Sequence, residues 1–303
     1  MPSLFEPLKL GAVTTPNRIF MAPLTRMRST QPGDVPNDLM LEYYVQRASA
    51  GLIISEGAQI SRQGKGYMDT PGIHTDEQVT AWRRVTDAVH AAGGRIACQL
   101  WHVGRVSHQS FHDGQLPVAP SSFAYSNRTT IRGENGQPTR VECPAPRALE
   151  NHEIPGLIET YRQAACNARA AGFDMVEIHA AHGYLLAQFM SAQSNNRTDQ
   201  YGGSLGNRAR LTLEVLDAVI GAWDAAHVGI RISPLGTFNG LDDTEGMPMC
   251  SYLAAALAER EVAFLHLSEP DWAGGPQLDD DFRVALRSAF PGTLIGAGNY
   301  DLA

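Results

Sequence analysis

The chain has 303 residues, of which 43% are hydrophobic and 18% are charged. This length accommodates one large domain or two small ones, and the apolar content is ample for a sizeable core. The formal net charge is −8, from 24 basic and 32 acidic residues. An acidic balance of this kind argues against nucleic acid as a partner.

Membrane insertion and secretion are also disfavoured by the sequence. No apolar run reaches the ~18 residues of a spanning helix, and residues 1–7 have neither the basic start nor the apolar centre of a signal peptide. The cysteines form no Cys-x-x-Cys pair and are read as free thiols of a reducing compartment. They are Cys98, Cys143, Cys166 and Cys250. We therefore predict a cytoplasmic enzyme with no membrane partner.

Short apolar strands alternate with helices along the chain. Residues 1–18 are expected to form an N-terminal cap. The apolar runs predict strands at 19–22, 52–57, 95–100, 173–179, 228–232, 262–267 and 293–298. The helical spacing of apolar residues predicts helices at 39–50, 76–92, 153–171, 207–226, 251–260 and 279–289. A long polar excursion at 101–150 is expected to lie over the active site, because such connections are usually functional.

This alternation predicts an α/β protein with a parallel sheet. The first strand lacks the Gly-x-Gly-x-x-Gly of a doubly wound nucleotide fold and is followed by Pro23-Leu24-Thr25-Arg26. Polar or ring residues follow nearly every strand, which is typical of a (β/α)₈ TIM barrel whose site is built from the loops after its strands. The barrel is therefore favoured over the doubly wound sheet.

Three proton-bearing rings lie at the end of the fourth predicted strand or just after it, at His179, His182 and Tyr184. Two histidines three residues apart can aim their ring N–H groups at one point. They are also compatible with a metal site, although no third ligand of suitable spacing accompanies them. A structural histidine pair is the third alternative, and the residues alone leave all three open.

Several motifs together resemble the old yellow enzyme family of FMN-dependent ene reductases, in its bacterial N-ethylmaleimide reductase and pentaerythritol tetranitrate reductase branch. The resemblance covers essentially the whole chain. The motifs are Pro16-Asn17-Arg18, Met21-Ala22-Pro23-Leu24-Thr25, Gln99-Leu100-Trp101-His102-Val103-Gly104-Arg105, His179-Ala180-Ala181-His182-Gly183-Tyr184, Asn196-Arg197-Thr198-Asp199-Gln200-Tyr201-Gly202-Gly203-Ser204 and Asn207-Arg208. The motif at 196–204 is expected to be structural rather than catalytic.

The resemblance implies a reaction and a set of catalytic residues. NADPH would reduce FMN and leave, and an enone-type substrate, a nitro compound or a nitrate ester would then take its place. His179 and His182 would bind the carbonyl or nitro oxygen of the substrate and stabilise the charge that develops there. Tyr184 would donate the proton, as a phenol can at neutral pH. Without its histidine neighbours, Tyr184 would be read as a buried structural tyrosine.

The resemblance also implies binding residues for FMN and for the substrate. Those expected at FMN are Pro23, Leu24, Thr25, Gly57, Gln99, His179, Arg231, Ala297 and Gly298. Those expected at the substrate are Thr25, Tyr67, Trp101, Arg140, His179 and His182. For Arg231 the competing interpretation is a structural ion pair, and for Tyr67, Trp101 and Arg140 it is ordinary loop packing. No metal is expected.

The sequence ends at Ala303, directly after the seventh predicted strand. In the family an eighth strand carries part of the phosphate-binding site. We therefore expect residues 1–303 to form one flavin-binding barrel that lacks its last βα unit, unless a complementing chain or an oligomer supplies the missing wall. The alternative to an active ene reductase is a non-catalytic, flavin-poor barrel remnant that acts only through a partner.

Overall fold

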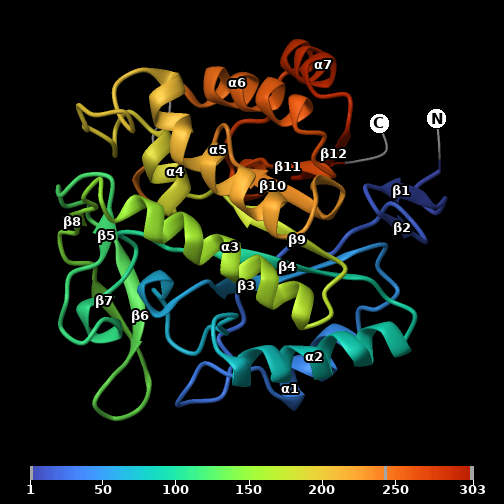
Figure 1. The fold of residues 1–303 in the computed structure, drawn as a ribbon, viewed down its shortest axis with the longest axis horizontal. Coiled ribbons are helices and arrows are strands. Elements are labelled where there is room, and N and C mark those ends of the chain that lie inside the picture. The colour runs from blue at the N-terminus through green and yellow to red at the C-terminus, as the bar shows by residue number, and fades with distance from the viewer. Residues whose placement is uncertain (1–2, 242–243, 301–303) are drawn as a thin grey trace.

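A parallel sheet forms the centre of the computed structural model, which describes residues 3–241 and 244–300 (Figure 1). Its six strands are hydrogen-bonded in the order β12-β11-β10-β9-β4-β3. They are β3 (Ile53–Gln59), β4 (Ile96–Trp101), β9 (Met175–His179), β10 (Val228–Ile232), β11 (Phe264–Ser268) and β12 (Thr293–Ala297). The sequence prediction for these six strands is confirmed to within two residues at each end.

The first predicted strand, at 19–22, forms only an isolated parallel bridge between Met21 and Ile53 of β3. The Met21 amide donates to the Leu52 carbonyl, and the Ile54 amide donates to the Met21 carbonyl. Pro23 follows and cannot donate to a further ladder bond, which limits this pairing. Within the described residues, β12 pairs only with β11, so the sheet stays open between β12 and the Met21 segment.

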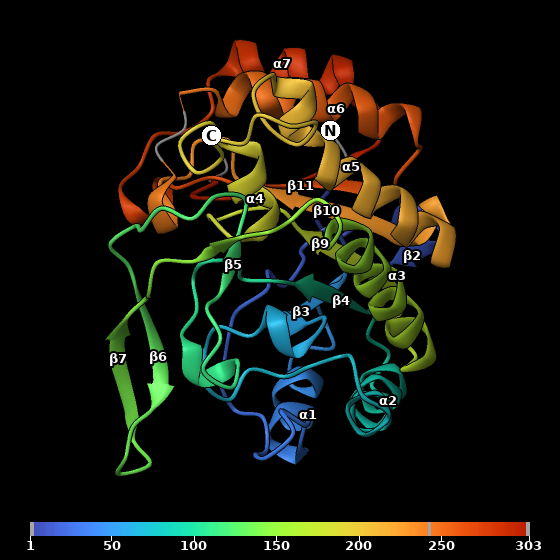
Figure 2. The same cartoon turned by 60° about the vertical axis from the view of Figure 1, so that its left-hand side comes forward.

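Helices surround this sheet on its outer side (Figures 1 and 2). They are α1 (Asp38–Val45), α2 (Asp76–Ala91), α3 (Ile154–Ala170), α4 (Leu185–Met190), α5 (Leu205–Ala222), α6 (Gly246–Glu259) and α7 (Asp280–Ala289). Short 3₁₀ segments lie at Arg62–Gly64, Gln109–Phe111, Ala225–His227, Phe238–Gly240 and Asp271–Ala273. Neighbouring helices contact one another in chain order from α1 to α3 and from α5 to α7, with α3 against α5. This is the arrangement expected of a barrel of βα units.

The helices predicted at 76–92, 153–171 and 279–289 are correct to within one residue at each end, and those predicted at 39–50, 207–226 and 251–260 differ by four or five residues at one end. The helix predicted at 39–50 ends at Val45, because residues 47–51 turn back to the Met21 segment, where the Gly51 amide donates to the Ile19 carbonyl. Helix α2 starts with a capping box between Thr75 and Gln78. The short helix α4 was not predicted, since its six residues are all buried and show no amphipathic period.

Three small two-stranded sheets lie outside the central one. The hairpin of β1 (Leu8–Leu10) and β2 (Val13–Thr15) contacts the segments that precede β10 and β11, and its Ala12 amide donates to the Ala226 carbonyl. The excursion at 101–150 contains β5 (Val118–Ala119) paired with β8 (Arg147–Ala148), and the hairpin of β6 (Arg128–Arg132) and β7 (Pro138–Glu142). In Figure 2 the hairpin of β6 and β7 projects at the lower left, apart from the labelled helices.

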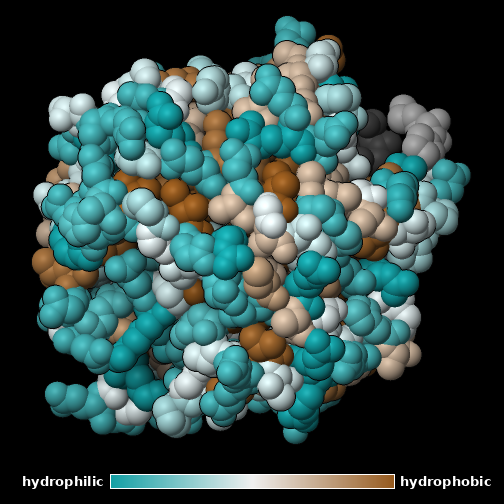
Figure 3. Space-filling model, in the orientation of Figure 1, coloured by the Kyte–Doolittle hydropathy of each residue, from teal (hydrophilic) through white to brown (hydrophobic). Residues whose placement is uncertain are grey.

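Hydrophilic residues predominate on the face shown in Figure 3, with hydrophobic residues scattered between them. Among the residues that the structure describes, no helix combines the length and apolarity needed to cross a membrane.

Packing inside the sheet depends on one close approach that gives a first prediction. Gly229 lies beside Phe264 in the β10–β11 register, and a Cβ at Gly229 would be 2.2 Å from the ring. Phe264 is fully buried. We expect Gly229→Ala to destabilise the protein by about 1–3 kcal/mol, measured by urea unfolding, because the ring has no free space into which to move.

Gly221 provides the matched control, since a Cβ there meets nothing within 4 Å on helix α5. Gly221→Ala should be neutral or stabilising, by up to about 1 kcal/mol. In a Phe264→Leu background the cost of Gly229→Ala should shrink, because the smaller side chain makes room. An unchanged cost in that background would contradict the steric explanation.

Candidate active site

A cavity of about 460 Å³ opens at the carboxyl ends of the strands. Side chains from the segment after Met21, from β4, β9, β10 and β11, and from two loops form its wall. They are Pro23, Leu24, Thr25, Gln99, Trp101, His179, His182, Tyr184, Arg231, Phe238, Asn239 and Ser268. The structure thus brings together most of the predicted site residues at one place, where the loops of a barrel meet.

A second cavity of about 510 Å³ adjoins the first and shares Arg231 and Ser268 with it. Ala297 and Gly298, both predicted at the cofactor, line this second cavity together with His266 of β11. This second cavity lies along the open side of the sheet, between β12 and the Met21 segment. Except for Gly57, the predicted cofactor residues are therefore divided between two adjoining cavities.

The two histidines meet because of a tight turn after β9. His182 and Gly183 both have positive φ angles, 56° and 70°, and a Cβ on Gly183 would be 2.5 Å from the Phe238 carbonyl oxygen. This turn folds the His182 ring back to the His179 ring, with centroids 5.3 Å apart and planes at 83°. Glycine at position 183 therefore permits both the left-handed backbone and the close approach.

One ring nitrogen of each imidazole has a hydrogen-bond partner. His179 Nδ1 accepts the Ala181 amide at 3.2 Å, so the neutral ring carries its proton on Nε2. Arg231 donates to Ser268 Oγ at 3.2 Å, and Ser268 Oγ lies 2.8 Å from His182 Nε2. When the Ser268 hydroxyl donates to this nitrogen, the neutral His182 ring carries its proton on Nδ1, and each ring retains one N–H that these partners do not use.

Burial keeps both histidines uncharged. Desolvation, followed by the nearby Arg231 charge, lowers the pKa of His182 to about 3. Desolvation, and then the neighbouring His182 and Arg231, holds the pKa of His179 well below its ordinary value. The pair can therefore offer two neutral N–H donors to an oxygen at neutral pH, without competing for its proton.

Tyr184 stands edge-on to two rings of the same wall. Its ring centroid lies 5.1 Å from that of His179 and 5.0 Å from that of Trp101. Burial is the main cause of its raised pKa, which is partly offset by the hydrogen bonds to Tyr67 and Asn239. The phenol therefore holds its proton at neutral pH and can act as a donor.

The structure places the three aromatic or cationic residues predicted at the substrate at different distances from the cavity. Trp101 lines the cavity. Tyr67 stacks on Trp101 with ring centroids 5.6 Å apart, and its hydroxyl lies 3.2 Å from that of Tyr184. Tyr67 therefore packs against two residues that line the cavity. Arg140 lies on β7 with an exposed side chain, and the structure does not bring it to the cavity.

The residues predicted to bind FMN can be checked for polar groups that suit a flat ring system with polar edges. Gln99 and Arg231 are nearly buried in the cavity wall, and Arg231 Nε has no partner among the described residues. An unpaired buried guanidinium nitrogen suits a site that is completed by an acceptor from a ligand. The predicted contact of Gly57 with the cofactor stays a prediction, and a Cβ there would be 2.5 Å from the Trp101 ring. The small size of this glycine makes room for Trp101.

Two residues that the sequence interpretation did not assign to the site are central to it. Ser268 connects Arg231 to His182, as described above. Asn239 donates to the His182 carbonyl at 2.7 Å and accepts from Arg105 and Asn127 of the excursion. Ser268 ends β11, so its position was a usable signal. Asn239 lies in a loop, and no pattern in the sequence pointed to it.

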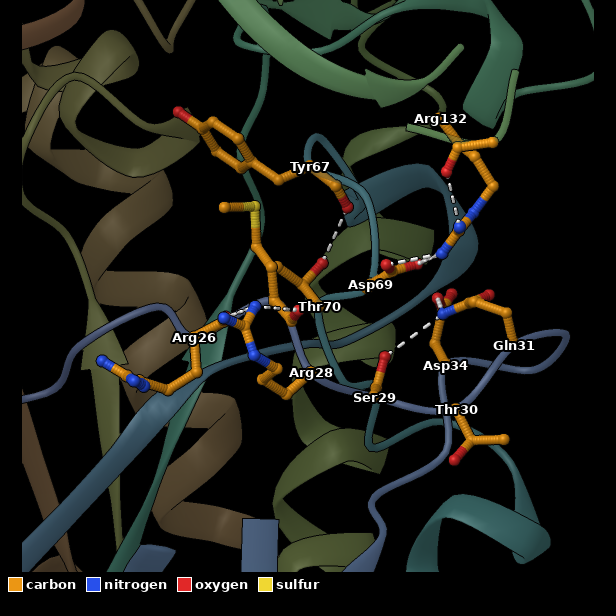
Figure 4. Close-up of polar contacts among 12 residues, drawn as sticks. Arg26, Arg28, Ser29, Thr30, Gln31, Asp34, Tyr67, Asp69, Thr70 and Arg132 are labelled. Carbon is orange, nitrogen blue, oxygen red and sulfur yellow. Dashed lines mark hydrogen bonds and ion pairs between the residues drawn. The ribbon is translucent and has the colours of Figure 1, made fainter. Parts of the chain in front are cut away.

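The loop after the first strand is fixed by polar contacts, several of which Figure 4 shows. Arg28 donates to the Arg26 and Met27 carbonyls, and Gln31 donates to Ser29 and Asp34. In this view the Tyr67 side chain points away from these contacts. The loop therefore has a defined path next to Thr25.

Glu56 of β3 contacts the same loop, at Arg26. Its carboxylate accepts the Arg26 amide at 3.2 Å and the Tyr44 hydroxyl at 3.2 Å, and the side chain is 1% exposed. Desolvation raises the pKa of Glu56 to about 7, although the hydrogen bonds from Arg26 and Tyr44 act in the opposite direction. This group titrates in the physiological range.

The raised pKa of Glu56 predicts a pH-dependent stability. The folded protein binds a proton here more tightly than the unfolded chain, so stability is fully present below pH 4.5 and falls as the pH rises through 7. We expect this group to cost about 3 kcal/mol between these limits. Thermal unfolding of the wild type and of Glu56→Gln at pH 5 to 8 checks it. The variant should lose this pH dependence, and equal slopes would contradict the assignment.

Comparisons with known proteins match this site to a family. The model of the NADH:flavin oxidoreductase / NADH oxidase family matches residues 3–303. The chain belongs to this family. Its members include the old yellow enzymes, and the chain is therefore a flavin-dependent oxidoreductase of the old yellow enzyme family. The resemblance found in the sequence is confirmed.

Relatives and solved structures agree with this assignment. The chain is 42% identical to 12-oxophytodienoate reductase 1 of Oryza sativa subsp. japonica over 303 residues, covering 98% of the chain and 77% of the relative. It is 44% identical to flavin oxidoreductase hxnT of Emericella nidulans over 275 residues, covering 88% and 69%. A morphinone reductase structure is 52% identical with a TM-score of 0.96, covering 99% of the chain and 80% of that protein. The parallel α/β fold is thus that of morphinone reductase.

One structural observation and the names of the relatives bear on the alternatives left open by the sequence. Within the described residues, no group of three or more His, Cys, Asp or Glu side chains is arranged to hold a metal ion. The relatives are named as reductases, which favours the enzyme over the non-catalytic remnant.

Proposed function

We propose that this old yellow enzyme relative is an FMN-dependent ene reductase that reduces the C=C bond of α,β-unsaturated carbonyl compounds, with NADPH as its reductant. Nitro compounds and nitrate esters would be further substrates. One observation carries the proposal: two neutral imidazole N–H donors and a protonated phenol line the same cavity. Such a set suits a reaction in which an oxygen gains negative charge and a carbon gains a proton.

The residues of the wall fit FMN as the bound group. Gln99 and Arg231 would face the polar edge of the ring, where a cation stabilises negative charge, and His179 would stand beside them. Thr25 would contact the ring from the segment after Met21 together with Pro23 and Leu24, and Ala297 and Gly298 would contact it from the adjoining cavity. When bound, FMN supplies the hydride.

The chain's own groups would perform the remaining steps. The N–H groups of His179 and His182 would bind the substrate oxygen and stabilise it as charge develops, because fixed donors need no reorganisation during the reaction. Tyr184 would then deliver its proton to the carbon next to the carbonyl. Trp101 would form the wall against which the apolar part of the substrate packs.

The nicotinamide would use the same cavity in turn. A morphinone reductase structure is described in complex with tetrahydroNAD, which supports a nicotinamide as the reductant. NADPH is the proposal for this chain, and NADH is the alternative that a comparison of the two coenzymes decides.

The excursion at 101–150 would shape the substrate side of the cavity. Its Arg105 and Asn127 both contact Asn239, which lines the cavity, and the Arg105 guanidinium lies 5.0 Å from the Tyr125 ring centroid. We propose that residues 1–303 act as one flavin-binding unit, with this excursion covering the site.

A visible spectrum tests the proposed function. The purified protein, incubated with FMN and desalted, should be yellow, should bleach with NADPH in the absence of oxygen, and should regain its colour with 2-cyclohexenone. A colourless folded protein would support the flavin-poor remnant instead. A yellow protein that NADPH bleaches but no enone recolours would contradict the substrate class.

A further inference from the structure

Glu177 is a fully buried carboxylate under the active site, and the reaction proposed above does not use it. It lies two residues before His179 on β9, so both side chains are on the same side of the strand. Gln99 of β4 is its register partner, and Arg231 of β10 is close enough to be affected by its charge. A carboxylate at this depth needs partners, because an unpaired buried charge is costly.

Its two oxygens have separate partners. Gln99 Nε2 donates to Oε1 at 2.7 Å, and His266 Nδ1 donates to Oε2 at 2.6 Å. Gln99, Glu177 and His266 are 3%, 0% and 1% exposed, so water does not compete for these bonds. The three side chains come from β4, β9 and β11 and form one continuous chain across the interior of the sheet.

A carboxylate accepts hydrogen bonds and has no proton to donate, and this determines how both partners are oriented. Gln99 must turn its NH₂ group to Glu177, which leaves its carbonyl oxygen for the cavity that it lines. His266 must keep its proton on Nδ1. Burial lowers the pKa of His266, so the ring is neutral and its Nε2 is an acceptor. That nitrogen is buried and has no partner among the described residues.

We propose that Glu177 is a positioning residue that sets the amide orientation of Gln99 and the tautomer of His266, so that the interior of the site presents hydrogen-bond acceptors beside the Arg231 donor. This inference rests on the proposed function in one respect, that the ligand is FMN. The pyrimidine edge of the flavin has an N–H donor between two carbonyl acceptors. A wall with a Gln99 acceptor next to an Arg231 donor is complementary to that alternation.

A purely structural role makes different predictions. If Glu177 served only to balance the Arg231 charge, the orientation of Gln99 and the tautomer of His266 would not depend on it. The histidine tautomer can be measured without any cofactor, through the ring ¹⁵N shifts of the apo protein. The His266 signals are assigned by comparison with His266→Gln.

The wild-type apo protein should show His266 as a neutral ring protonated on Nδ1. A ring protonated on Nε2, or a charged imidazolium at pH 7, would overturn the proposal. This measurement needs no variant of Glu177, so it can overturn the proposal even if those variants fold poorly. It is also independent of FMN binding. If the wild type binds no FMN, the proposed function fails while this test still stands.

Two variants test the dependence on Glu177. In Glu177→Gln the new amide can accept on one side only, so either His266 moves its proton to Nε2 or Gln99 turns and loses its fit to FMN. Glu177→Met removes both acceptors, and the FMN dissociation constant, measured by flavin fluorescence, should rise at least tenfold. Glu214→Gln is the matched control. Glu214 lies on helix α5, outside the cavities, and its carboxylate accepts a hydrogen bond from the Tyr201 hydroxyl. It should leave both readouts unchanged.

The charge of Glu177 adds a second readout. Its removal should favour reduced over oxidised FMN, because less negative charge remains near the ring. A tenfold change in the ratio of the two dissociation constants corresponds to about 30 mV in the two-electron potential. If Glu177→Gln alters neither the His266 tautomer nor FMN binding nor the potential, Glu177 is not a positioning residue.

Discussion

Tyr184→Phe is expected to slow the oxidation of the reduced enzyme by an enone by about 10²–10⁴-fold, the range of a lost general acid. The hydroxyl lies in the cavity wall beside His179, and its raised pKa keeps it protonated. Reduction by NADPH should be nearly unchanged, because that step needs no proton from the phenol. Stopped-flow absorbance of the flavin measures the two half-reactions separately.

Tyr161→Phe is the matched control for this experiment. The Tyr161 hydroxyl on helix α3 is fully buried, lies outside both cavities and has no partner among the described residues. Its loss should leave both half-reactions unaffected. An equal slowing of reduction and oxidation in Tyr184→Phe would indicate a damaged site and would contradict the role of Tyr184 as proton donor.

His182→Ala is expected to reduce kcat/KM for an enone by about 10²–10³-fold, as for the loss of one donor to a developing oxyanion. Asparagine is the informative comparison, because its amide also offers an N–H donor but cannot be protonated. His182→Asn should therefore recover most of the activity that alanine loses. Steady-state kinetics with one enone and saturating NADPH give both values.

The same pair of variants tests the charge state of the histidine. Because the pKa of His182 lies near 3, the ring stays neutral at pH 5 to 8 and should add no inflection to the kcat/KM profile in that range. An inflection between pH 5 and 8 that disappears in His182→Asn would show that the charged ring binds the substrate. In that case the neutral-donor assignment is wrong.

Local patterns predicted the strands well and the edges of the helices less well. Strand segments such as 228–232 are short, fully buried and bounded by turn residues, so composition alone marks them. The end of α1 depends on the contact between Gly51 and Ile19, which is distant in sequence from the helix start. Helix α4 is buried on every side and therefore has no amphipathic period to detect.

The sequence by itself determined the alternation of strands and helices, the family, and the convergence of His179, His182 and Tyr184, because residues after parallel strands meet at one end of a barrel. Only the tertiary structure decided the hydrogen-bond partners of the two imidazole rings, the bridging position of Asn239 and the exposure of Arg140. The contacts of His182 with Ser268 and of Asn239 with the His182 carbonyl join residues more than 50 positions apart. The spacing of residues along the chain carries no record of such contacts.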